Sequence, residues 1–211
     1  MNQAGHPTAI VFAISGASGA PIALKLLKEL FQFQLTIYLV FSETGKKIFQ
    51  METHTPPDAK KIIESAKNEF GKLKRCVLAK VIQYEQDNLF APPASGTNPW
   101  DAMVICPASA GACGRIASGT GEDLIARCAD VAIKEKRKLI LLVRESPLSP
   151  LLLENLSRLS RAGAIILPPV LTFYHEPESQ EEQINFWVAK VLDILGFPHK
   201  LIKRWGMAGA K

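Results

Sequence analysis

Short apolar runs alternate along this chain with amphipathic segments of helical length. Apolar runs that read as strands occupy 8–14, 35–41, 77–84, 102–106, 139–143 and 164–167. Hydrophobic residues at helical spacing, together with helix start and stop signals, predict helices over 21–33, 43–53, 58–74, 151–162 and 179–195, and another that runs from 124 past 133. Strands that alternate with helices in this way predict an α/β fold: a Rossmann-like, doubly wound and mostly parallel sheet with helices on both faces.

The length of 211 residues and the hydrophobic content of 47% suit one full-sized core, so a single domain over 1–211 is expected. Its core would cover about 8–196, and the apolar tail over 197–211 would pack on a neighbouring subunit. The net charge of +5 is spread among acidic residues without a basic stripe, which argues against nucleic-acid binding. No apolar run reaches the ~20 residues that span a bilayer, and a cytoplasmic location is expected.

The four cysteines show no C-x-x-C spacing and the four histidines form no recognisable ligand set, so neither a metal site nor a disulfide framework is expected. Candidate chemistry begins instead where the first strand ends, in the small residues Gly16, Ala17 and Ser18. A strand followed by a loop of small residues and then a helix is a typical phosphate-binding arrangement, because backbone N–H groups and the helix N-terminus can approach an anion there. Ser18 is expected to cap that helix. A tight turn without a ligand is the alternative.

A second small-residue loop, 107–112, follows the strand 102–106, and the two loops would face one crevice. Ser42 closes another strand at the same edge, while Glu52 lies in the short helix after it. On the residues alone, Ser42 is favoured as a helix cap and Glu52 as a solvated carboxylate. The long loop 87–100, rich in Pro, Gly and Ser, is expected to close over a site or reach a neighbour.

Charged residues follow in the second half of the chain. Arg127 and Lys134 lie on one helix, where a solvated cationic face is the competing interpretation. Arg144 and Glu145 end the strand 139–143 directly, so they would lie beside the crevice, with Glu145 available as a general base. A structural ion pair between these two is the alternative.

A set of motifs spread over nearly the whole chain, from Ala9 to Gly206, resembles the UbiX-type flavin prenyltransferases. The motifs are GASGA, APPASG, CPAS, ARCADVAIKEKRKLILLVRESPL, GAIILPP, FYH-x-P and KRWG. This family lies within the wider group of flavin-dependent cysteine decarboxylase-like folds. The resemblance implies transfer of a dimethylallyl group from dimethylallyl phosphate to N5 and C6 of reduced FMN. The prenylated FMN would then serve a UbiD-type decarboxylase. It also implies a homo-oligomer, a dodecamer with sites between subunits.

Site residues carried over by motif fall into two groups. The FMN group contains Gly16, Ala17, Ser18, Ser42, Ser109, Ala110, Gly111, Ala112 and Arg127. The group around the allylic phosphate contains Lys134, Arg144, Glu145, Tyr174, Lys190 and Trp205, with Glu52 as a further polar member. Of these, Ser18, Glu52, Lys134 and Glu145 would be catalytic: cations and a phenol hold the leaving phosphate, and a carboxylate takes the proton lost at C6. No metal is implied.

Three positions depart from the family pattern. Lys190 stands in place of an arginine and Leu89 in place of a tryptophan, while Ala112 lacks a hydroxyl that is often present. A lysine is a point charge without a bidentate fork, so these changes bear on substrate affinity more than on reaction type. Two other functions remain open from the sequence: an FMN-dependent cysteine decarboxylase, and a non-catalytic FMN carrier.

Overall fold

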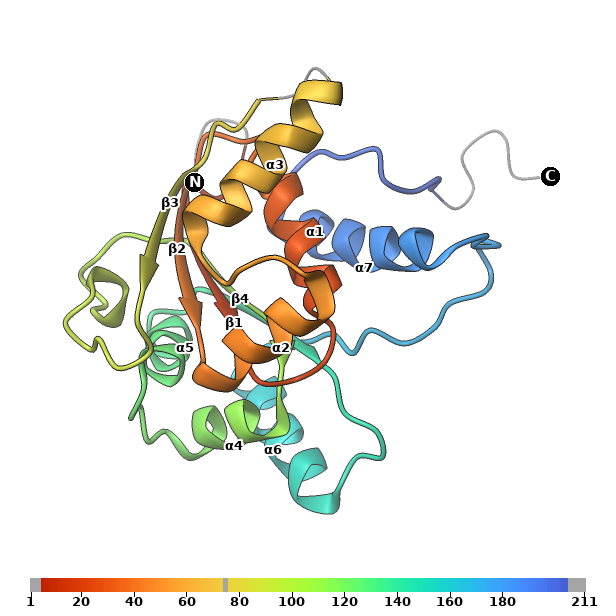
Figure 1. Ribbon diagram of the computed structural model, residues 1–211. Coiled ribbons are helices and arrows are strands. Elements are labelled where there is room, and N and C mark those ends of the chain that lie inside the picture. The colour runs from red at the N-terminus through yellow and green to blue at the C-terminus, as the bar shows by residue number, and fades with distance from the viewer. Residues whose placement is uncertain (1–4, 74–75, 205–211) are drawn as a thin grey trace.

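In the described part of the chain, six parallel strands form a single sheet at the centre of the fold (Figure 1). The structure is a computed structural model, and it describes residues 5–73 and 76–204. The expectations for Trp205 and for the tail beyond Arg204 therefore lie outside the described residues. The strands are β1 (Ala9–Ile14), β2 (Thr36–Phe41), β3 (Lys80–Tyr84), β4 (Ala102–Ala108), β5 (Lys138–Val143) and β6 (Ile165–Ile166).

The strands lie side by side in the order β3-β2-β1-β4-β5-β6. The chain runs outward from β1 to β3, then returns to the centre and runs outward again from β4 to β6. The strand order thus reverses between β1 and β4, which pair in parallel with Ile10 opposite Ala102. In open α/β sheets ligands bind at the carboxyl ends of the strands beside such a switch point. The predicted doubly wound fold is confirmed.

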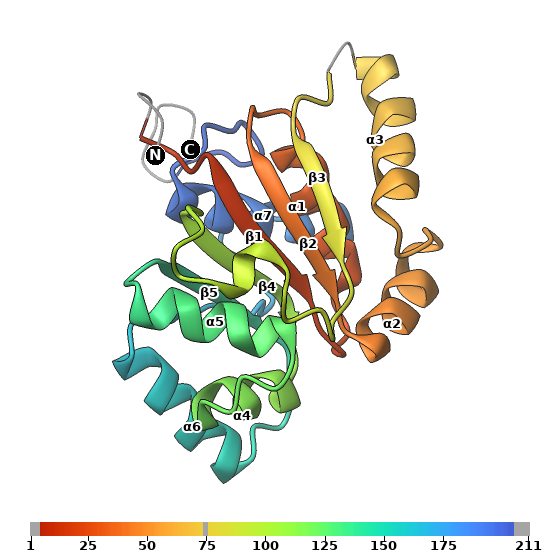
Figure 2. The same cartoon turned by 90° about the vertical axis from the view of Figure 1, so that its left-hand side faces the viewer.

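Helices cover both faces of the sheet (Figure 2). One layer contains α1 (Ala20–Leu30), α2 (Glu43–Thr53), α3 (Ala59–Leu73) and α7 (Gln180–Leu195). The other contains α4 (Ala110–Ser118), α5 (Leu124–Lys134) and α6 (Pro150–Arg161). A 3₁₀ turn at Pro92–Ala94 lies within the long loop after β3 and contacts α5.

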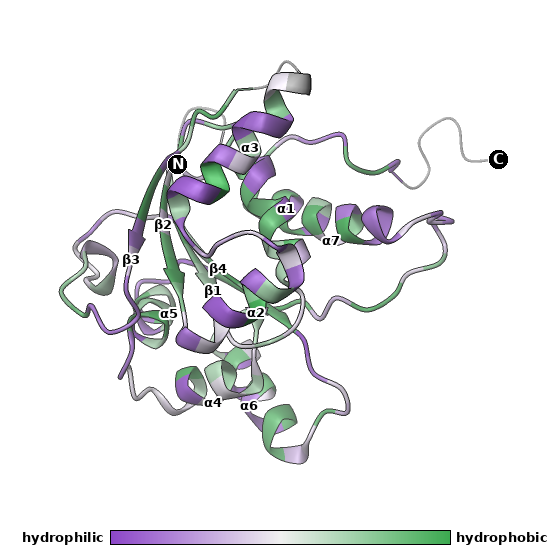
Figure 3. Ribbon diagram, in the orientation of Figure 1, coloured by the Kyte–Doolittle hydropathy of each residue, from purple (hydrophilic) through white to green (hydrophobic). Residues whose placement is uncertain are grey.

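The two layers bury separate hydrophobic cores, one on each face of the sheet. Successive residues of β1 point alternately into the two cores. Ile10 and Phe12 pack toward α1 and α7, whereas Val11 and Ala13 pack toward α4 and α5. Side chains alternate between the faces of a strand, so a central strand must be apolar throughout. Figure 3 accordingly shows hydrophobic colour along β1 and hydrophilic colour along much of α3.

One helix was missed in the sequence. The segment 107–112 was expected to be a loop, but Ala110 already begins α4, which continues to Ser118. Its sequence, AGACGRIAS, is rich in Gly and other small residues and carries few of the large apolar side chains that make helical periodicity visible. Packing of Cys113 and Ile116 into the core stabilises it nonetheless. The last strand, expected over 164–167, pairs only at Ile165 and Ile166.

Candidate active site

A buried serine joins the ends of the two central strands. Ser15, just after β1, is 1% exposed. Its hydroxyl lies 2.9 Å from the carbonyl oxygen of Pro107 and accepts the backbone N–H of Ser109 at 2.8 Å. Its own N–H donates to the same Pro107 oxygen at 3.2 Å. Ser15 was not singled out in the sequence, although a serine directly after a fully apolar strand is the kind of buried polar group that must find partners.

A cavity of about 660 Å³, here called the switch-point cavity, opens at this edge of the sheet. It is lined by Gly16, Ser42, Glu43, Thr44, Gln86, Ser109, Ala110, Gly111, Arg115, Glu122, Asp123 and Glu145. The loop after β1 and the segment after β4 thus face one cavity, as the sequence predicts. Its volume falls within the range of sites for cofactors and small molecules, about 300–1,000 Å³.

Two helices begin at the wall of this cavity. Ser42 caps α2 by accepting the N–H of Gly45 at 2.9 Å, and Ser109 caps α4 by accepting the N–H of Ala112 at 3.2 Å. The helix-cap interpretation of Ser42 is therefore confirmed. The first amides of a helix have no intrahelical acceptor and carry its partial positive charge. At α4 these amides belong to Ala110 and Gly111, which line the cavity and suit an anion.

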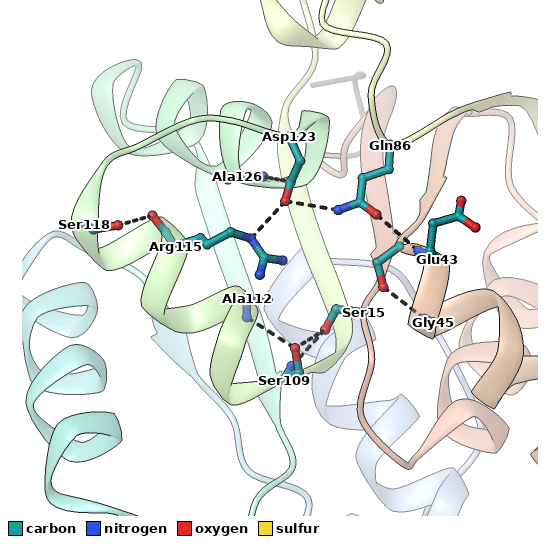
Figure 4. Close-up of polar contacts among 11 residues, drawn as sticks. Ser15, Glu43, Gly45, Gln86, Ser109, Ala112, Arg115, Ser118, Asp123 and Ala126 are labelled. Atoms are coloured by element: carbon teal, nitrogen blue, oxygen red, sulfur yellow. Dashed lines mark hydrogen bonds and ion pairs between the residues drawn. The ribbon is translucent and has the colours of Figure 1, made fainter.

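A chain of polar contacts borders the cavity (Figure 4). The backbone N–H of Glu43 donates to Oε1 of Gln86 at 3.1 Å, and Nε2 of Gln86 donates to Oδ2 of Asp123 at 3.1 Å. The same oxygen accepts Nε of Arg115 at 2.9 Å. Asp123 also caps α5 by accepting the N–H of Ala126 at 2.8 Å. Gln86, Arg115 and Asp123 were not predicted from the sequence, because only the fold brings them together.

Glu52 has a structural task that the sequence did not reveal. Its Oε2 accepts the backbone N–H groups of Gly19 and Ala20, each at 2.9 Å, at the N-terminus of α1. The capping role expected of Ser18 is wrong: Gly19, with φ 120°, is the N-cap, and the carboxylate of Glu52 satisfies the amides instead. Glu52 is half-buried, so the interpretation as a freely solvated carboxylate is also wrong.

An adjoining cavity of about 390 Å³ lies on the other side of this loop. Its lining residues are Ser18, Gly19, Pro21, Ile22, Glu52, Pro169, Val170, Leu171, Gln180, Gln183, Ile184 and Trp187. Since Gly16 lines the first cavity and Ser18 the second, the loop after β1 borders both. Ala17 and Ala112 are buried and line neither cavity.

Arg144 and Glu145 lie at the carboxyl end of β5 but have different partners. Arg144 donates from Nε to the carbonyl oxygen of Ser18 at 3.3 Å. Glu145 lines the switch-point cavity, is exposed, and accepts the N–H of Ser146 at 3.1 Å. The structure thus does not support the alternative of an ion pair between them. Arg144 connects the loop after β1 to the end of β5, and Glu145 keeps a carboxylate oxygen at the cavity.

Tyr174 and Lys190 meet at one aromatic ring. The ring of Tyr174 lies edge-on to Phe186 with 5.9 Å between centroids, and Nζ of Lys190 lies 5.6 Å from the centroid of the same ring. His175 stacks on Phe186 at 4.8 Å with an angle of 11° between planes, in agreement with a structural role. The fold therefore brings together two of the residues expected around the allylic phosphate, although they are 16 positions apart in sequence.

Neither Arg127 nor Lys134 lines either cavity. Arg127 lies 3.8 Å from Asp130 and Lys134 lies 3.8 Å from Glu135, and both are exposed on α5. This helix begins beside Gln86 at the carboxyl edge of the sheet, where Leu124 donates to the Gln86 carbonyl oxygen at 2.8 Å. A rise of 1.5 Å per residue places Lys134 roughly 15 Å away, toward the opposite edge. Within the single chain these cations form the solvated face that was the alternative.

In the described part of the chain, no group of three or more His, Cys, Asp or Glu residues is arranged to hold a metal ion. The cysteines are free thiols, and burial raises the pKa of Cys113 to about 11 and that of Cys128 to about 12. These thiols are therefore protonated at neutral pH and are poor nucleophiles. The described helices include none with the length and apolar character needed to cross a membrane.

Comparison with known proteins gives consistent matches. The model of the family described as Flavoprotein matches residues 2–194. The flavin prenyltransferase UbiX of Pseudomonas aeruginosa is 39% identical over 201 residues, which cover 95% of each chain. A crystal structure of AnUbiX (PadA1) in complex with FMN and dimethylallyl pyrophosphate matches 94% of this chain and 97% of that chain, with a TM-score of 0.82 and 33% identity. A dodecameric FMN-dependent UbiX-like decarboxylase from Escherichia coli O157:H7 matches 93% of this chain and 98% of its own, with a TM-score of 0.80 and 33% identity.

Proposed function

The chain belongs to the UbiX-type flavin prenyltransferases within the Flavoprotein family, and from this premise we propose that it joins a dimethylallyl group from dimethylallyl phosphate to N5 and C6 of reduced FMN. One observation carries the proposal: the ends of β1 and β4, bonded through Ser15, place two helix N-termini at one cavity beside Glu145. A phosphate-bearing ligand and a proton acceptor would thus meet at the carboxyl edge of the sheet.

The residues present fit FMN. Amides of Ala110 and Gly111 at the start of α4, with the caps Ser42 and Ser109, form a cradle for a phosphate. A side chain at Gly45 would meet the carbonyl oxygen of Ile14, so the glycine lets α2 begin close to the end of β1. When bound, reduced FMN supplies the nucleophilic positions N5 and C6, and the allylic phosphate supplies the electrophilic carbon.

The chain's own residues would hold the leaving group and move one proton. Tyr174 and Lys190, placed at one ring, would bind the phosphate with Arg144. Fixed donors favour breakage of the allylic C–O bond, because negative charge grows on the departing phosphate. Glu145 would accept the proton lost from C6. Ser18, held through its carbonyl oxygen by Arg144, would orient the reacting edge of the flavin, and Glu52 fixes that loop.

The site would be shared between copies of the chain. Lys134 lies toward the far edge of its own subunit, so its proposed phosphate contact would be made in another subunit's site. Arg127, one helical turn after Asp123, would contact FMN. The tip of the loop after β3 supports such contacts, since Leu89 is 40% exposed and Phe90 is 101% exposed. A dodecamer, as in the Escherichia coli relative, is the assembly we expect. Trp205 would act near such an interface.

The product would pass to a UbiD-type decarboxylase, in ubiquinone biosynthesis or aromatic acid decarboxylation, and the reaction would take place in the cytoplasm. The cysteine decarboxylase alternative has weaker support, since the histidine that it would need early in the chain, His54, ends α2 and lines neither cavity. The FMN carrier differs from the proposal by one measurable property: it would bind flavin without consuming the allylic phosphate.

The test is a reaction of purified protein with reduced FMN and dimethylallyl monophosphate under anaerobic conditions. Mass spectrometry of the released flavin should show the gain of one C5 unit, together with stoichiometric phosphate release. A parallel reaction with dimethylallyl pyrophosphate identifies the preferred donor. Bound FMN that keeps its mass in both reactions would refute prenyl transfer and favour the carrier. Loss of CO₂ from a cysteine-containing peptide would favour the decarboxylase.

A further inference from the structure

The switch-point cavity has an unusual charge balance for a site that would hold a phosphate. Among its lining side chains that the structure describes, Arg115 carries the one positive charge, against the carboxylates of Glu43, Glu122, Asp123 and Glu145. A phosphate monoester carries close to two negative charges at neutral pH. Helix N-termini supply only about half a charge each. A cation at the start of α4 would therefore decide whether the phosphate is attracted.

Arg115 is held in place for such a contact. Its Nε donates to Oδ2 of Asp123 at 2.9 Å, and Asp123 is fixed in turn by Gln86 and by the amide of Ala126. In the described hydrogen bonds of its side chain Arg115 uses Nε alone, which leaves the N–H groups on its two terminal nitrogens for a ligand. A guanidinium anchored at one edge presents its other donors in a fixed orientation.

The free end of Arg115 points back along α4 toward the first turn of the helix. Nη1 lies 3.6 Å from the position that a Cβ on Gly111 would occupy. Figure 4 shows the guanidinium between Asp123 and the segment with Ser109 and Ala112. Arg115 lies four residues, about one helical turn, after Gly111, and thus brings positive charge to the amides that begin the helix.

The first turn of α4 has few side-chain donors. Ala110 and Ala112 have no hydroxyl, and the hydroxyl oxygen of Ser109 accepts the amide of Ala112 and the hydroxyl of Ser15, so only the single O–H of Ser109 remains to donate. The turn thus offers a phosphate mainly backbone N–H groups. Arg115, three residues after Ala112, can supply the charged donors that those alanines do not.

We propose that Arg115 binds the phosphate of FMN in this protein and replaces the hydroxyl contacts missing from the first turn of α4. The inference rests on the proposed function, because it assumes that the switch-point cavity holds FMN. It makes Arg115 a cofactor-binding residue, and Asp123 the residue that positions it. The competing interpretation is an ion pair with Asp123 that serves only to join α4 to α5.

A comparison of FMN with riboflavin isolates this contact, because the two differ only in the phosphate. The unsubstituted full-length protein and Arg115→Gln are freed of flavin and titrated with each ligand, with flavin fluorescence as the readout and no allylic phosphate present. Gln keeps an N–H donor for Asp123 but removes the charge. We expect Arg115→Gln to lower FMN affinity about 10- to 100-fold and to change riboflavin affinity less than about twofold.

Two further variants sharpen the comparison. Arg115→Lys restores a charge without the fork and should recover part of the FMN affinity. Arg158→Gln is the matched control: Arg158 lies on α6, donates to the carbonyl oxygen of Ala117 at 3.4 Å and does not line the cavity, so the same substitution there should leave both affinities unchanged. Should Arg115→Gln fail to fold, the Lys variant provides the same ratio of affinities.

The outcomes separate this inference from the proposed function. If Arg115→Gln loses equal affinity for FMN and riboflavin, Arg115 is structural. If its FMN affinity is unchanged and its KM for dimethylallyl phosphate is raised, Arg115 binds the phosphate of that substrate. Either result overturns the inference while prenyl transfer stands. If the unsubstituted protein binds no FMN at all, the proposed function itself fails.

Discussion

Ser15 and Ser109 are 94 positions apart in sequence, yet the hydroxyl of Ser15 accepts the backbone N–H of Ser109 at 2.8 Å. This bond fixes the spacing between the loop after β1 and the start of α4. The two walls of the switch-point cavity therefore depend on one buried hydroxyl, which connects the packing of the sheet to the geometry of the site.

We expect Ser15→Ala to destabilise the protein and to weaken FMN binding. The substitution leaves the half-buried amide of Ser109 without its acceptor, a loss that costs about 1 kcal/mol, toward the lower end of the usual range. Chemical denaturation gives the stability, and fluorescence titration gives the FMN affinity. Ser118→Ala is the control, because the Ser118 hydroxyl is exposed and donates to the carbonyl oxygen of Arg115 at 2.9 Å; it should change stability by less than about 0.5 kcal/mol. If both substitutions lower the stability and the FMN affinity equally, the bond between Ser15 and Ser109 does not hold the cavity walls in place.

The sequence predicted most of the fold because its strongest signals were local. Apolar strands and helix start signals act within a few positions, and the helices expected from 58 and 179 do begin there. Asp58 accepts the N–H of Lys61 at 3.0 Å before α3, and Ser179 accepts the N–H of Glu182 at 3.2 Å before α7. The helix over 43–53 was predicted with the observed bounds. Helix α4 was not predicted because its sequence has no clear hydrophobic periodicity, and its stability comes from the packing of small residues.

The lining of the switch-point cavity was predictable where it consists of strand ends, and not where it depends on contacts between distant segments. Gly16, Ser42, Ser109 and Glu145 follow directly from the parallel topology. In contrast, the contact between Glu52 and the N-terminus of α1 joins segments 33 positions apart. No local pattern marks such a pair, so Ser18 was expected to have the capping role that belongs to Glu52.

Lys134 provides a test of sites shared between subunits. Lys134→Ala should slow use of dimethylallyl phosphate, because the leaving group loses a cationic donor, while FMN binding persists. Tyr174→Phe should act similarly and more weakly, since it removes one hydroxyl. Steady-state kinetics with phosphate release as the readout measure both, and flavin content after purification is the control. A Lys134→Ala protein purified without FMN would place this lysine in the cofactor site instead.

Mixed oligomers make the shared site visible. Lys134→Ala and Glu145→Gln subunits are unfolded, mixed and refolded together. If the two residues of one site come from different subunits, some sites in the mixture contain both intact residues and activity returns to a fraction set by the mixing ratio. Activity no higher than the average of the two separate variants would show that each chain completes its own site.

Asp193 binds the segment that follows α7 through His199 and Arg204, and we expect this contact to weaken in acid. Its oxygens accept hydrogen bonds from Nη2 of Arg204 at 2.6 Å and from Nη1 at 3.2 Å, and Nε2 of His199 lies 3.0 Å away. Hydrogen bonding from Arg204 holds the pKa of Asp193 below its ordinary value of 3.8. A lowered carboxyl pKa stabilises the folded state above the ordinary pKa, and this contribution disappears as pH falls through the lower folded-state pKa.

Asp193→Asn should therefore lower the melting temperature at neutral pH, and the difference from the unsubstituted protein should shrink as the pH falls through the lowered pKa of the native carboxyl, which then also becomes neutral. The partners are partly exposed, so the effect will be small and will weaken at high salt. Glu154→Gln on α6, a carboxylate outside this cluster, controls for the general effect of removing a negative charge. A difference between Asp193→Asn and the unsubstituted protein that stays constant from neutral to acidic pH would contradict this expectation.

Glu145 is the residue on which the proposed chemistry depends most directly. Glu145 follows β5 at the carboxyl edge of the sheet and lines the switch-point cavity. The neighbouring Arg144 donates to the carbonyl oxygen of Ser18 and not to Glu145. Glu145→Gln keeps the shape of the side chain and removes the proton acceptor. Because loss of a positioned general base typically costs about 10²- to 10⁴-fold in rate, we expect formation of the finished C5-adduct of FMN to slow by that amount, with FMN affinity unchanged.

Rapid-quench mass spectrometry measures this rate, and Glu145→Asp offers a second comparison, since it restores the carboxylate at a shorter reach and should recover part of the activity. Phosphate release followed in the same samples separates the two halves of the reaction: the allylic C–O bond can still break in Glu145→Gln, so phosphate should appear faster than the finished product. If Glu145→Gln makes that product at the unsubstituted rate, the carboxylate is only a polar wall of the cavity. The departing phosphate, held by Tyr174 and Lys190, would then be the proton acceptor to test next.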